Sequence, residues 1–351
     1  MRLSVIIPVH NAAAFLDRCL ESVRRSSFGN YECIVVDDAS TDQSQRIART
    51  HGATVVALDQ NGGPARARNR GAAQAQGEIV LFLDADVCVH TETLGQVDAY
   101  FRQHPSADAL IGSYDDTPAD PGFISQYKNL FHHFVHHTSR PQAWTFWAGC
   151  GAIRRDIFLA AGGFDESYRR PCIEDIELGF RLRAQGRRID LNPAIQVTHL
   201  KRWTFRTLLR TDLFDRGIPW FRLMLRDRTM PPDLNLTLAH RLSVALVFGV
   251  GLWLAAALAR WLTPSPSQWP LFLFLSLVMA PVGALLYLNF DLYRFFARKR
   301  GRLFAAQAVP LHWLYYCYCG VAAGVAVVLH VFDKLNPRRQ RPGLASPRAT
   351  R

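Results

Sequence analysis

Two carboxylates one residue apart, at the end of an apolar run, are the part of the sequence best suited to chemistry. Asp84 and Asp86 follow Ile79–Leu83, which has the length and composition of a buried parallel strand. Alternate residues of an extended chain point the same way, so both side chains are expected to share one ligand beyond the strand's carboxyl end. Such a pair suits Mg²⁺ or Mn²⁺, which would neutralise a bound diphosphate. The alternative is a polar turn with two solvated aspartates.

The residues before this pair alternate between strand and helix patterns. Strands are predicted at residues 3–9, 33–38, 53–58 and 79–83. A helix is predicted over residues 11–26, a second after a cap formed by Ser40, Thr41 and Asp42, and a third beginning at Pro64. This alternation indicates an α/β fold with a parallel, doubly wound sheet.

Seven stretches of the chain, in order over about residues 3–200, resemble the nucleotide-sugar glycosyltransferases of family 2. They are SVIIPVHNAAAFLDRCLESV, IVVDDASTD, NGGPARARNRG, EIVLFLDAD, WAGCGAIRRDIF, GGFDES and IEDIELGFRLR. The resemblance implies an inverting enzyme with a GT-A fold, in which the sheet is mostly parallel and Rossmann-like. It also implies a catalytic domain that covers residues 1–200.

The resemblance assigns nucleotide-sugar binding to residues in five regions of this domain. They are Pro8, Val9, Asn11, Asp38, Arg68, Asp84, Ala85, Asp86, Gly149 and Gly151. Asp38 would accept a ring N–H of the nucleotide base, and Arg68 would lie near the nucleotide. For Arg68 the alternative is a solvated helix face shared with Arg66 and Arg70. The two glycines would permit close approach of the backbone to the donor sugar and the acceptor.

The same resemblance indicates the metal ligands and the base. Asp86 would bind Mn²⁺ or Mg²⁺ directly, Asp84 would assist, and His199 at the end of a predicted strand would complete the site. The alternative for His199 is a structural hydrogen bond. Inverting transfer needs a base for the acceptor proton. Asp175 is the predicted base and Glu174 the fallback, at the start of a helix where an exposed capping acid is the alternative.

Net charge and hydropathy indicate a membrane protein. The chain of 351 residues has a net charge of +12, with eight Lys or Arg in residues 199–228, five in residues 291–302 and six in residues 334–351. Between these basic clusters lie uncharged runs of 18, 30 and 30 residues, and a membrane span needs about 20 apolar residues. Three helices are predicted, at about 242–262, 269–290 and 309–332, within a membrane region of residues 242–332.

The basic clusters flank these runs, so anionic lipid explains them better than nucleic acid does. Residues 201–241 mix aromatic and basic side chains, which indicates an amphipathic segment in the membrane interface; an ordinary domain helix is the alternative. No signal peptide is predicted, because the first strand begins at residue 3, so the catalytic domain is expected in the cytoplasm. Residues 333–351 are predicted to be a basic disordered tail, and a third segment bent at Pro310 would keep that tail inside.

Two further patterns lie in the histidines near residue 135 and in residues 199–203. The histidines at 132, 133, 136 and 137 have helical spacing, which favours a polar helix near the acceptor over a metal site. Residues 199–203 are similar to the Gln/Arg-X-X-Arg-Trp signature of processive synthases, but the first position departs from it.

The sequence therefore predicts a membrane-anchored, metal-dependent, inverting glycosyltransferase. The donor would be a nucleotide sugar, with UDP ahead of GDP or dTDP, and the acceptor a lipid or lipid-linked sugar, of which a polyprenyl phosphate is one form. The alternatives are a polysaccharide synthase subunit and a non-catalytic membrane scaffold. Multi-pass insertion in the cell membrane, with the catalytic domain in the cytoplasm, is the expected location.

Overall fold

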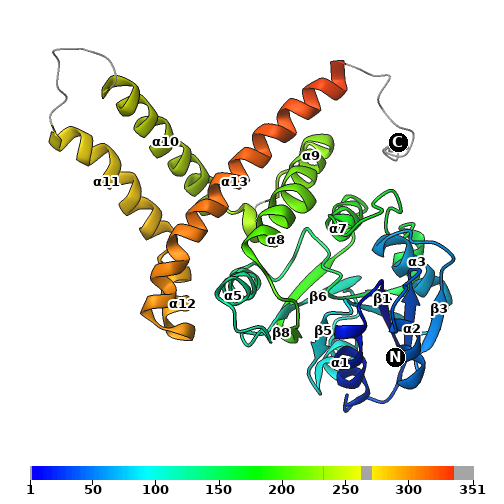
Figure 1. The fold of residues 1–351 in the computed structure, drawn as a ribbon. Coiled ribbons are helices and arrows are strands. Elements are labelled where there is room, and N and C mark those ends of the chain that lie inside the picture. The colour runs from blue at the N-terminus through cyan, green and yellow to red at the C-terminus, as the bar shows by residue number, and fades with distance from the viewer. Residues whose placement is uncertain (1, 232, 262–270, 336–351) are drawn as a thin grey trace. The chain divides into compact units, whose positions relative to one another are not determined.

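The computed structural model describes residues 2–231, 233–261 and 271–335. The chain divides into a first unit built on a β-sheet, which runs to Leu208, and a helical second unit, Leu209–Leu329. Figure 1 labels many of the helices and strands of both units.

One eight-stranded sheet carries the first unit, in the order β3-β2-β1-β4-β7-β6-β8-β5. Its strands are β1 (Leu3–Val9), β2 (Tyr31–Asp37), β3 (Thr54–Ala57), β4 (Ile79–Leu83), β5 (Val87–Val89), β6 (Ala109–Tyr114), β7 (Cys150–Arg154) and β8 (Ile189–His199). Neighbouring strands from β3 to β4 are parallel, as predicted. The remaining half is mixed, because β7 runs antiparallel to both β4 and β6, and β5 runs antiparallel to β8.

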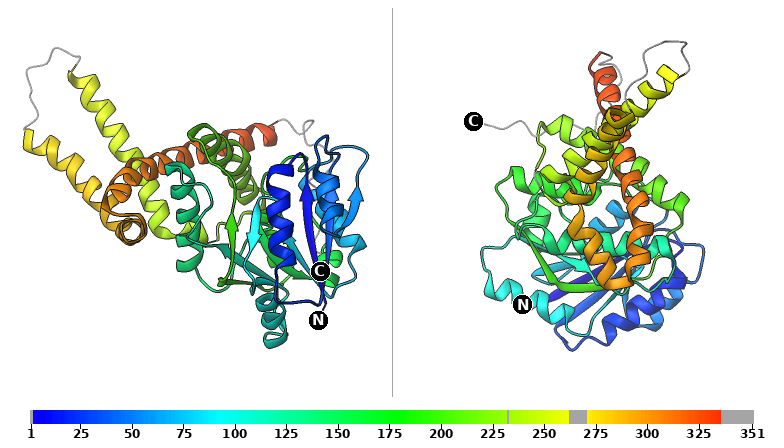
Figure 2. Two further views of the ribbon diagram at one scale, coloured as in Figure 1. Left: turned by 60° about the horizontal axis from the view of Figure 1, so that its bottom comes forward. Right: turned by 90° about the vertical axis from the view of Figure 1, so that its left-hand side faces the viewer.

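Helices cover both faces of the parallel half, as Figure 2 shows from two further directions. The helices of this unit are α1 (Ala13–Arg24), α2 (Ser44–Thr50), α3 (Pro64–Gln74), α4 (Thr93–Gln103), α5 (Phe123–Thr138), α6 (Arg155–Ala160), α7 (Glu174–Ala184) and α8 (Phe205–Arg210). Alternate residues of β1 point to opposite faces. Val5 and Ile7 join the core cluster that contains Leu16 of α1, whereas Ile6 packs against Gly71 of α3.

The predicted cap of the second helix is confirmed for Asp42 only. Helix α2 begins at Ser44, and the side chain of the residue before it, Gln43, makes no capping hydrogen bond. Instead, the Asp42 carboxylate accepts the backbone N–H of Ser44 and that of Ala13, both at 2.9 Å. The Asp42 side chain therefore binds the first N–H groups of both α1 and α2, although these helices begin 31 residues apart in the chain (Ser44 − Ala13).

The second unit is helical in its described residues. It contains a π-helix (Thr211–Gly217), α9 (Ile218–Asp227), a short 3₁₀ turn (Leu234–Leu236), α10 (Leu238–Trp261), α11 (Leu271–Leu288), α12 (Phe290–Arg300) and α13 (Arg302–Leu335). The basic cluster at residues 291–302 is largely the helix α12, which buries Leu292, Tyr293 and Phe296. Pro310 lies inside the continuous helix α13 rather than at a bend that divides it.

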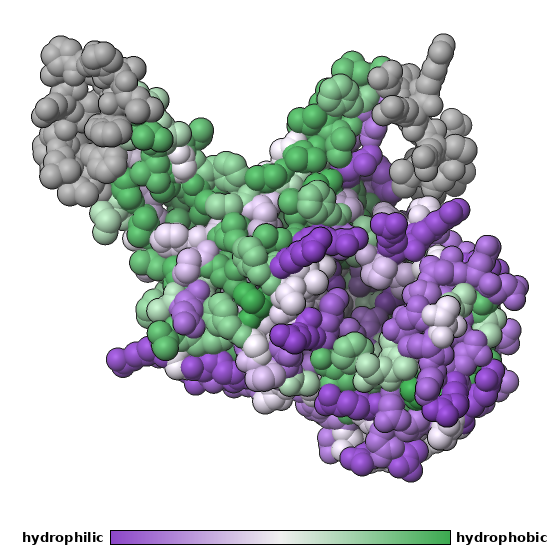
Figure 3. Space-filling view, in the orientation of Figure 1, coloured by the Kyte–Doolittle hydropathy of each residue, from purple (hydrophilic) through white to green (hydrophobic). Residues whose placement is uncertain are grey.

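Among the described residues, two helices are long and apolar enough to cross a membrane, Leu238–Ala259 and Arg302–Leu335. They match two of the three predicted spans by length and composition. The stretch 277–288 is a shorter apolar helix, and the first two residues of the predicted span 269–290 lie outside the described residues. Large apolar side chains such as Leu252, Met279 and Val328 are more than half exposed, and Figure 3 shows apolar residues gathered over these helices.

The helix that carries Glu174 and Asp175 packs against backbone at a glycine. A Cβ on Gly179 of α7 would lie 2.6 Å from two backbone atoms of Thr145. Gly179→Ala is therefore expected to lower the free energy of unfolding by about 1–3 kcal/mol. Gly95→Ala in α4 is the matched control, since its Cβ would meet only Phe28 at 3.7 Å, and it should raise that energy by about 0.4–1 kcal/mol. Denaturant unfolding measures both, and equal effects would contradict the close packing of α7.

Candidate functional site

Two left-handed turns lie together where β1 and β2 end. Pro8 and Val9 pair with Val36 and Asp37 at the last positions of the two strands. Beyond them, Asn11 has φ 50° and Ala39 has φ 57°, values that are uncommon for residues other than glycine. The Asn11 side-chain oxygen accepts the Thr41 N–H at 2.8 Å, and the Asn11 N–H donates to Ser40 Oγ at 3.0 Å. These bonds fix the loop that is predicted to hold the nucleoside.

Asp38 fastens the loop that precedes α3. Its carboxylate is 3% exposed and accepts the N–H groups of Gly62 at 2.8 Å and Gly63 at 2.7 Å. Each carboxylate oxygen has a second lone pair, so these bonds are compatible with a further donor. Contact with a nucleotide base stays a prediction for Asp38.

Arg68 is buried between two acidic side chains. Its guanidinium donates to Asp84 Oδ1 at 2.7 Å and to Glu174 Oε1 at 2.8 Å, and it lies over the ring of Phe164. Burial lowers the pKa of Arg68, but the charges of Asp84 and Glu174 outweigh that effect and raise it. A solvated helix face is therefore the wrong description of Arg68, although Arg70 on the same helix is exposed.

The residues 84–86 form a turn between β4 and β5, not an extended continuation of the strand. The Val87 N–H donates to the Asp84 carbonyl, which closes the turn. The two carboxylates consequently point to different partners: Asp84 meets Arg68, and Asp86 Oδ2 lies 3.6 Å from His199 Nε2. The expectation that alternate residues share one direction is wrong here, because the chain turns after Leu83.

Asn129 of α5 fixes the orientation of the His199 ring. The Asn129 amide nitrogen donates to the Ser125 carbonyl at 2.8 Å, so its oxygen faces His199 Nδ1 at 2.7 Å. Nδ1 must therefore carry a proton, and Nε2 is the atom that faces Asp86. A neutral His199 presents a lone pair there beside a carboxylate oxygen, which is a donor set that suits a divalent cation.

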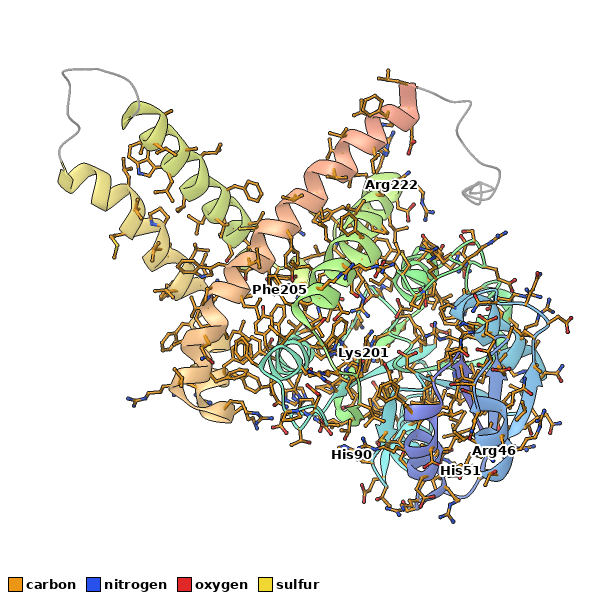
Figure 4. All side chains as sticks on the ribbon, in the orientation of Figure 1. Arg46, His51, His90, Lys201, Phe205 and Arg222 are labelled. Carbon is orange, nitrogen blue, oxygen red and sulfur yellow. The ribbon has the colours of Figure 1, made fainter. Side chains whose placement is uncertain are left out.

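The charge on Asp86 is stabilised within this pair. Burial raises its pKa, but His199 in its protonated, positively charged form and the charge of Lys201 hold the pKa of Asp86 below its ordinary value. Figure 4 labels Lys201, which follows β8, and His90, which follows β5 at the opposite end of this antiparallel pair. Among the residues that the structure describes, no three His, Cys, Asp or Glu side chains form a metal-binding group. Any cation held by Asp86 and His199 would need further ligands from a substrate.

Glu174 and Asp175 begin α7 as predicted, and their surroundings differ. Glu174 is 4% exposed, pairs with Arg68, and accepts the Cys172 N–H at 2.9 Å, so it is not an exposed capping acid. Asp175 is partly exposed, and its Oδ2 accepts the Ala148 N–H at 3.2 Å. Glu177 on the same helix pairs with Arg181, away from this cluster.

Ala148 leads into the predicted glycines Gly149 and Gly151, and both are buried. A Cβ on Gly149 would lie 2.7 Å from the indole of Trp147, so the absent side chain lets this ring fold back over the backbone.

The histidines of α5 serve the sheet. His133 and His136 donate from Nδ1 to the carbonyls of Tyr114 and Gly112, where the pairing of β6 with β8 shifts register. Burial lowers the pKa of His136 to about 4, which keeps it neutral. The segment is a helix, α5, and its nearness to an acceptor stays a prediction.

A surface hollow of about 570 Å³ lies elsewhere on this unit, and none of the predicted site residues lines it. Its lining residues come from α1 and from the end of β5; they are Arg18, Glu21, Ser22, Arg25, Cys88, Val89, His90, Thr91 and Glu92.

Sequence reasoning missed Asn129, Tyr114 and Trp147, which contact or flank the predicted residues. Asn129 lies 70 positions from His199 and belongs to no motif with it. Trp147 stood inside a matched stretch, two positions before Gly149, and its aromatic type was the available signal.

The orientation of His199 by Asn129 can be tested through metal affinity. Asn129→Leu removes the acceptor for Nδ1–H and should weaken Mn²⁺ binding in the presence of UDP by about 10–100-fold. Asn129→Asp keeps an acceptor oxygen and should bind Mn²⁺ more tightly than Asn129→Leu. Electron paramagnetic resonance of free Mn²⁺ gives both affinities. Equal affinities for the wild type and Asn129→Leu would show that Asn129 does not orient a metal ligand.

Comparison with known proteins bears on the family and the fold. The sequence model of glycosyl transferase family 2 matches residues 4–160. The poly(ribitol-phosphate) beta-N-acetylglucosaminyltransferase TarS of Staphylococcus aureus is 37% identical over 118 residues, 32% of this chain and 21% of that protein. A PGL/p-HBAD biosynthesis glycosyltransferase of Mycobacterium bovis is 36% identical over 115 residues, 31% of this chain and 45% of that protein. The chain thus spans less than half the length of these relatives.

Two solved structures have the same fold. The mannosyltransferase PcManGT from Pyrobaculum calidifontis, in complex with GDP-Man and Mn²⁺, has a TM-score of 0.56 at 20% identity, over 95% of this chain and 88% of that one. S. aureus TarS 1–349 in complex with UDP-GlcNAc has a TM-score of 0.51 at 17% identity, over 95% and 92%. The predicted GT-A fold is confirmed, and residues 4–160 belong to glycosyl transferase family 2.

Proposed function

We propose that the protein is a membrane-anchored inverting glycosyltransferase that moves a sugar from a nucleotide sugar to a lipid-linked acceptor. One observation carries the proposal: Arg68 joins the acidic turn after β4 to the acidic start of α7. Arg68 and Asp84 lie within residues 4–160, the stretch that the model of glycosyl transferase family 2 matches, and Glu174 follows that stretch. The cluster combines the parts that a displacement at an anomeric carbon needs, which are a site for a charged leaving group and a carboxylate to receive a proton.

The donor is a UDP-sugar in this proposal. The support is that TarS, a relative, is an N-acetylglucosaminyltransferase and that its structure was solved with UDP-GlcNAc. A GDP-sugar is the second choice, since PcManGT was solved with GDP-Man. The nucleoside would lie at the left-handed turns after β1 and β2, with Asp38 as the acceptor for a ring N–H.

The cation of this proposal, Mn²⁺ or Mg²⁺, would be held by Asp86 and His199 with Asp84 beside them, and it would neutralise the departing diphosphate. The protein's own residues prepare this site. Asn129 presents Nε2 of His199, the turn at residues 84–86 presents the Asp86 carboxylate, and Arg68 holds Asp84 through one oxygen.

Asp175 acts as the base. The acceptor hydroxyl oxygen forms a bond to the anomeric carbon while the bond from that carbon to the diphosphate oxygen breaks, and the hydroxyl proton passes to Asp175. Glu174 is less suited to this role because it is buried and its Oε1 is paired with the Arg68 cation, whereas both Asp175 oxygens accept backbone N–H groups, Oδ1 from Ile176 and Oδ2 from Ala148. Asp175 accepts the Ala148 N–H at 3.2 Å and is more exposed than Glu174.

The attachment to the cytoplasmic face of the membrane rests on composition. Two helices have the length and hydropathy of membrane spans, and the segment of residues 201–241 that precedes them carries basic side chains beside exposed apolar ones such as Phe214. A lipid-linked acceptor would diffuse in the same plane. The Mycobacterium bovis relative is named for PGL and p-HBAD biosynthesis.

The role of Asp175 can be tested by an isosteric change. Asp175→Asn keeps the size of the side chain but removes the carboxylate that takes the proton. Sugar transfer should fall by roughly 10²–10⁴-fold, the usual worth of a general base. Nucleotide affinity, measured by calorimetry with UDP, should change little.

Glu174→Gln is the comparison for this test. It breaks the contact with Arg68, and its effect should appear first as a loss of stability. Normal turnover by Asp175→Asn together with a large loss of turnover in a folded Glu174→Gln protein would assign the base to Glu174 instead.

The interfacial role of residues 201–241 can be tested with a peptide of this sequence. Its tryptophan fluorescence should shift on vesicles that contain phosphatidylglycerol, and salt should weaken the binding. Replacing Arg222 and Arg226 by Gln should weaken it by about 2 kcal/mol in total. Binding that ignores both lipid charge and salt would contradict this role.

A further inference from the structure

Three aromatic side chains of the first unit contact one another and are all partly exposed. The ring centroids of Tyr114 and Trp147 are 4.8 Å apart, those of Tyr114 and His132 are 4.6 Å apart, and those of His132 and Trp147 are 4.9 Å apart. They come from the end of β6, the middle of α5 and the loop before β7. We call these three residues the aromatic wall.

The aromatic wall is held in place from behind. Buried His136 contacts both His132 and Trp147, and its ring is fixed by the bond to the Gly112 carbonyl. Gly149 lets the Trp147 indole lie against the backbone. The rings are therefore pre-organised, so ordering them on ligand binding costs little free energy.

The position of the aromatic wall connects it to the proposed chemistry. The Tyr114 ring stacks on His199 with a centroid distance of 4.4 Å and an angle of 14° between the planes. Trp147 directly precedes Ala148, whose N–H bonds to Asp175. The aromatic wall thus lies between the proposed metal ligand and the proposed base, which is where an acceptor must place its hydroxyl.

We propose that the aromatic wall binds a sugar ring of the acceptor, so that the acceptor is a glycoside rather than a polyprenyl phosphate. This inference rests on the proposed function and names the acceptor class for the same site. A sugar offers an apolar face of C–H groups and a polar edge, and Trp, Tyr and His rings with polar tips match that pattern.

Charge supports the glycoside over the phosphate. Asp84, Asp86, Glu174 and Asp175 give the candidate site four carboxylates, and Arg68 is already shared by two of them. A phosphate acceptor would bring further negative charge to these carboxylates, and like charges at close range are costly. A neutral hydroxyl also needs a base, which an ionised phosphate oxygen does not.

The test uses the full chain in detergent with UDP bound. The probes are the methyl glycosides of glucose, galactose, mannose and N-acetylglucosamine, with undecaprenyl phosphate as the competing acceptor. Saturation-transfer NMR measures glycoside affinity without requiring turnover. Trp147→Phe keeps a flat aromatic face, Trp147→Leu keeps apolar bulk without one, and Trp144→Phe is a control at a tryptophan that instead packs on Arg183 and Phe180.

At least one glycoside should bind the wild type, and Trp147→Leu should weaken that glycoside by about three- to tenfold. Trp147→Phe should stay within about threefold of the wild type, Trp144→Phe should match it, and the affinity for UDP should not change in any variant. The inference is overturned if no glycoside binds, or if Trp147→Leu binds the glycoside as tightly as the wild type does. It is also overturned if Trp147→Phe and Trp147→Leu lose the same glycoside affinity, because that result indicates packing alone. Turnover of undecaprenyl phosphate in preference to every glycoside would also overturn it, while leaving the glycosyltransferase activity itself established. If no sugar is transferred from any nucleotide sugar, the proposed function is wrong. The NMR measurement of glycoside binding is independent of that result, because it does not require turnover.

Discussion

A single buried cation connects the two acidic parts of the candidate site. Arg68 donates to Asp84 after β4 and to Glu174 at the start of α7, and almost none of its side chain meets solvent. Removing one partner of such a buried group would leave an uncompensated charge, at a cost of about 3–5 kcal/mol. The ion pairs of Arg68 with Asp84 and with Glu174 therefore depend on each other, and together they fix α7 relative to β4. Asp175 follows Glu174 directly, so its position depends on the same contact.

The contact of Arg68 with two acids gives neighbouring carboxylates different partners. In the pair Asp84 and Asp86, Asp84 binds Arg68, and in the pair Glu174 and Asp175, Glu174 binds Arg68. Asp86 and Asp175 have other contacts. Asp86 faces His199, while Asp175 faces the backbone of Ala148. Adjacent acids with similar intrinsic chemistry thus acquire different roles from their contacts alone. The turn at residues 84–86 makes this possible, because an extended chain would have pointed Asp84 and Asp86 at the same partner.

The extent to which the sequence predicted these features follows from the range of the interactions involved. Local signals were sufficient for β1, for the start of α3 at Pro64 and for the start of α7 at Glu174. They were insufficient for the mixed half of the sheet, because the antiparallel placement of β7 between β4 and β6 is a long-range pairing without a local pattern. The family motifs pointed to acidic residues on both sides of Arg68, and the roles of these residues stay predictions. Arg68 itself was left between a nucleotide contact and a solvated helix face, because its partners lie 16 and 106 positions away. Asn129 was missed for the same reason.

The helical unit shows a related limit of reading charge and hydropathy alone. Counting uncharged residues found the apolar helices, yet what holds these helices to one another is polar. The Asn289 amide donates to Ser243 Oγ of α10 at 3.1 Å and its oxygen accepts from the Tyr316 hydroxyl of α13 at 2.6 Å, so one side chain before α12 joins three helices. In lipid, where apolar surface gives little drive for helices to associate, such hydrogen bonds set the packing. Helix α13 also has 34 residues, about 51 Å at 1.5 Å per residue, against an apolar bilayer core of about 30 Å. A helix of that length would extend beyond the apolar layer, so its apolar run does not by itself fix which of its residues lie in lipid. The polar network at Asn289 is therefore the better guide to how these helices are arranged, and it could be recognised only once the helices were placed together.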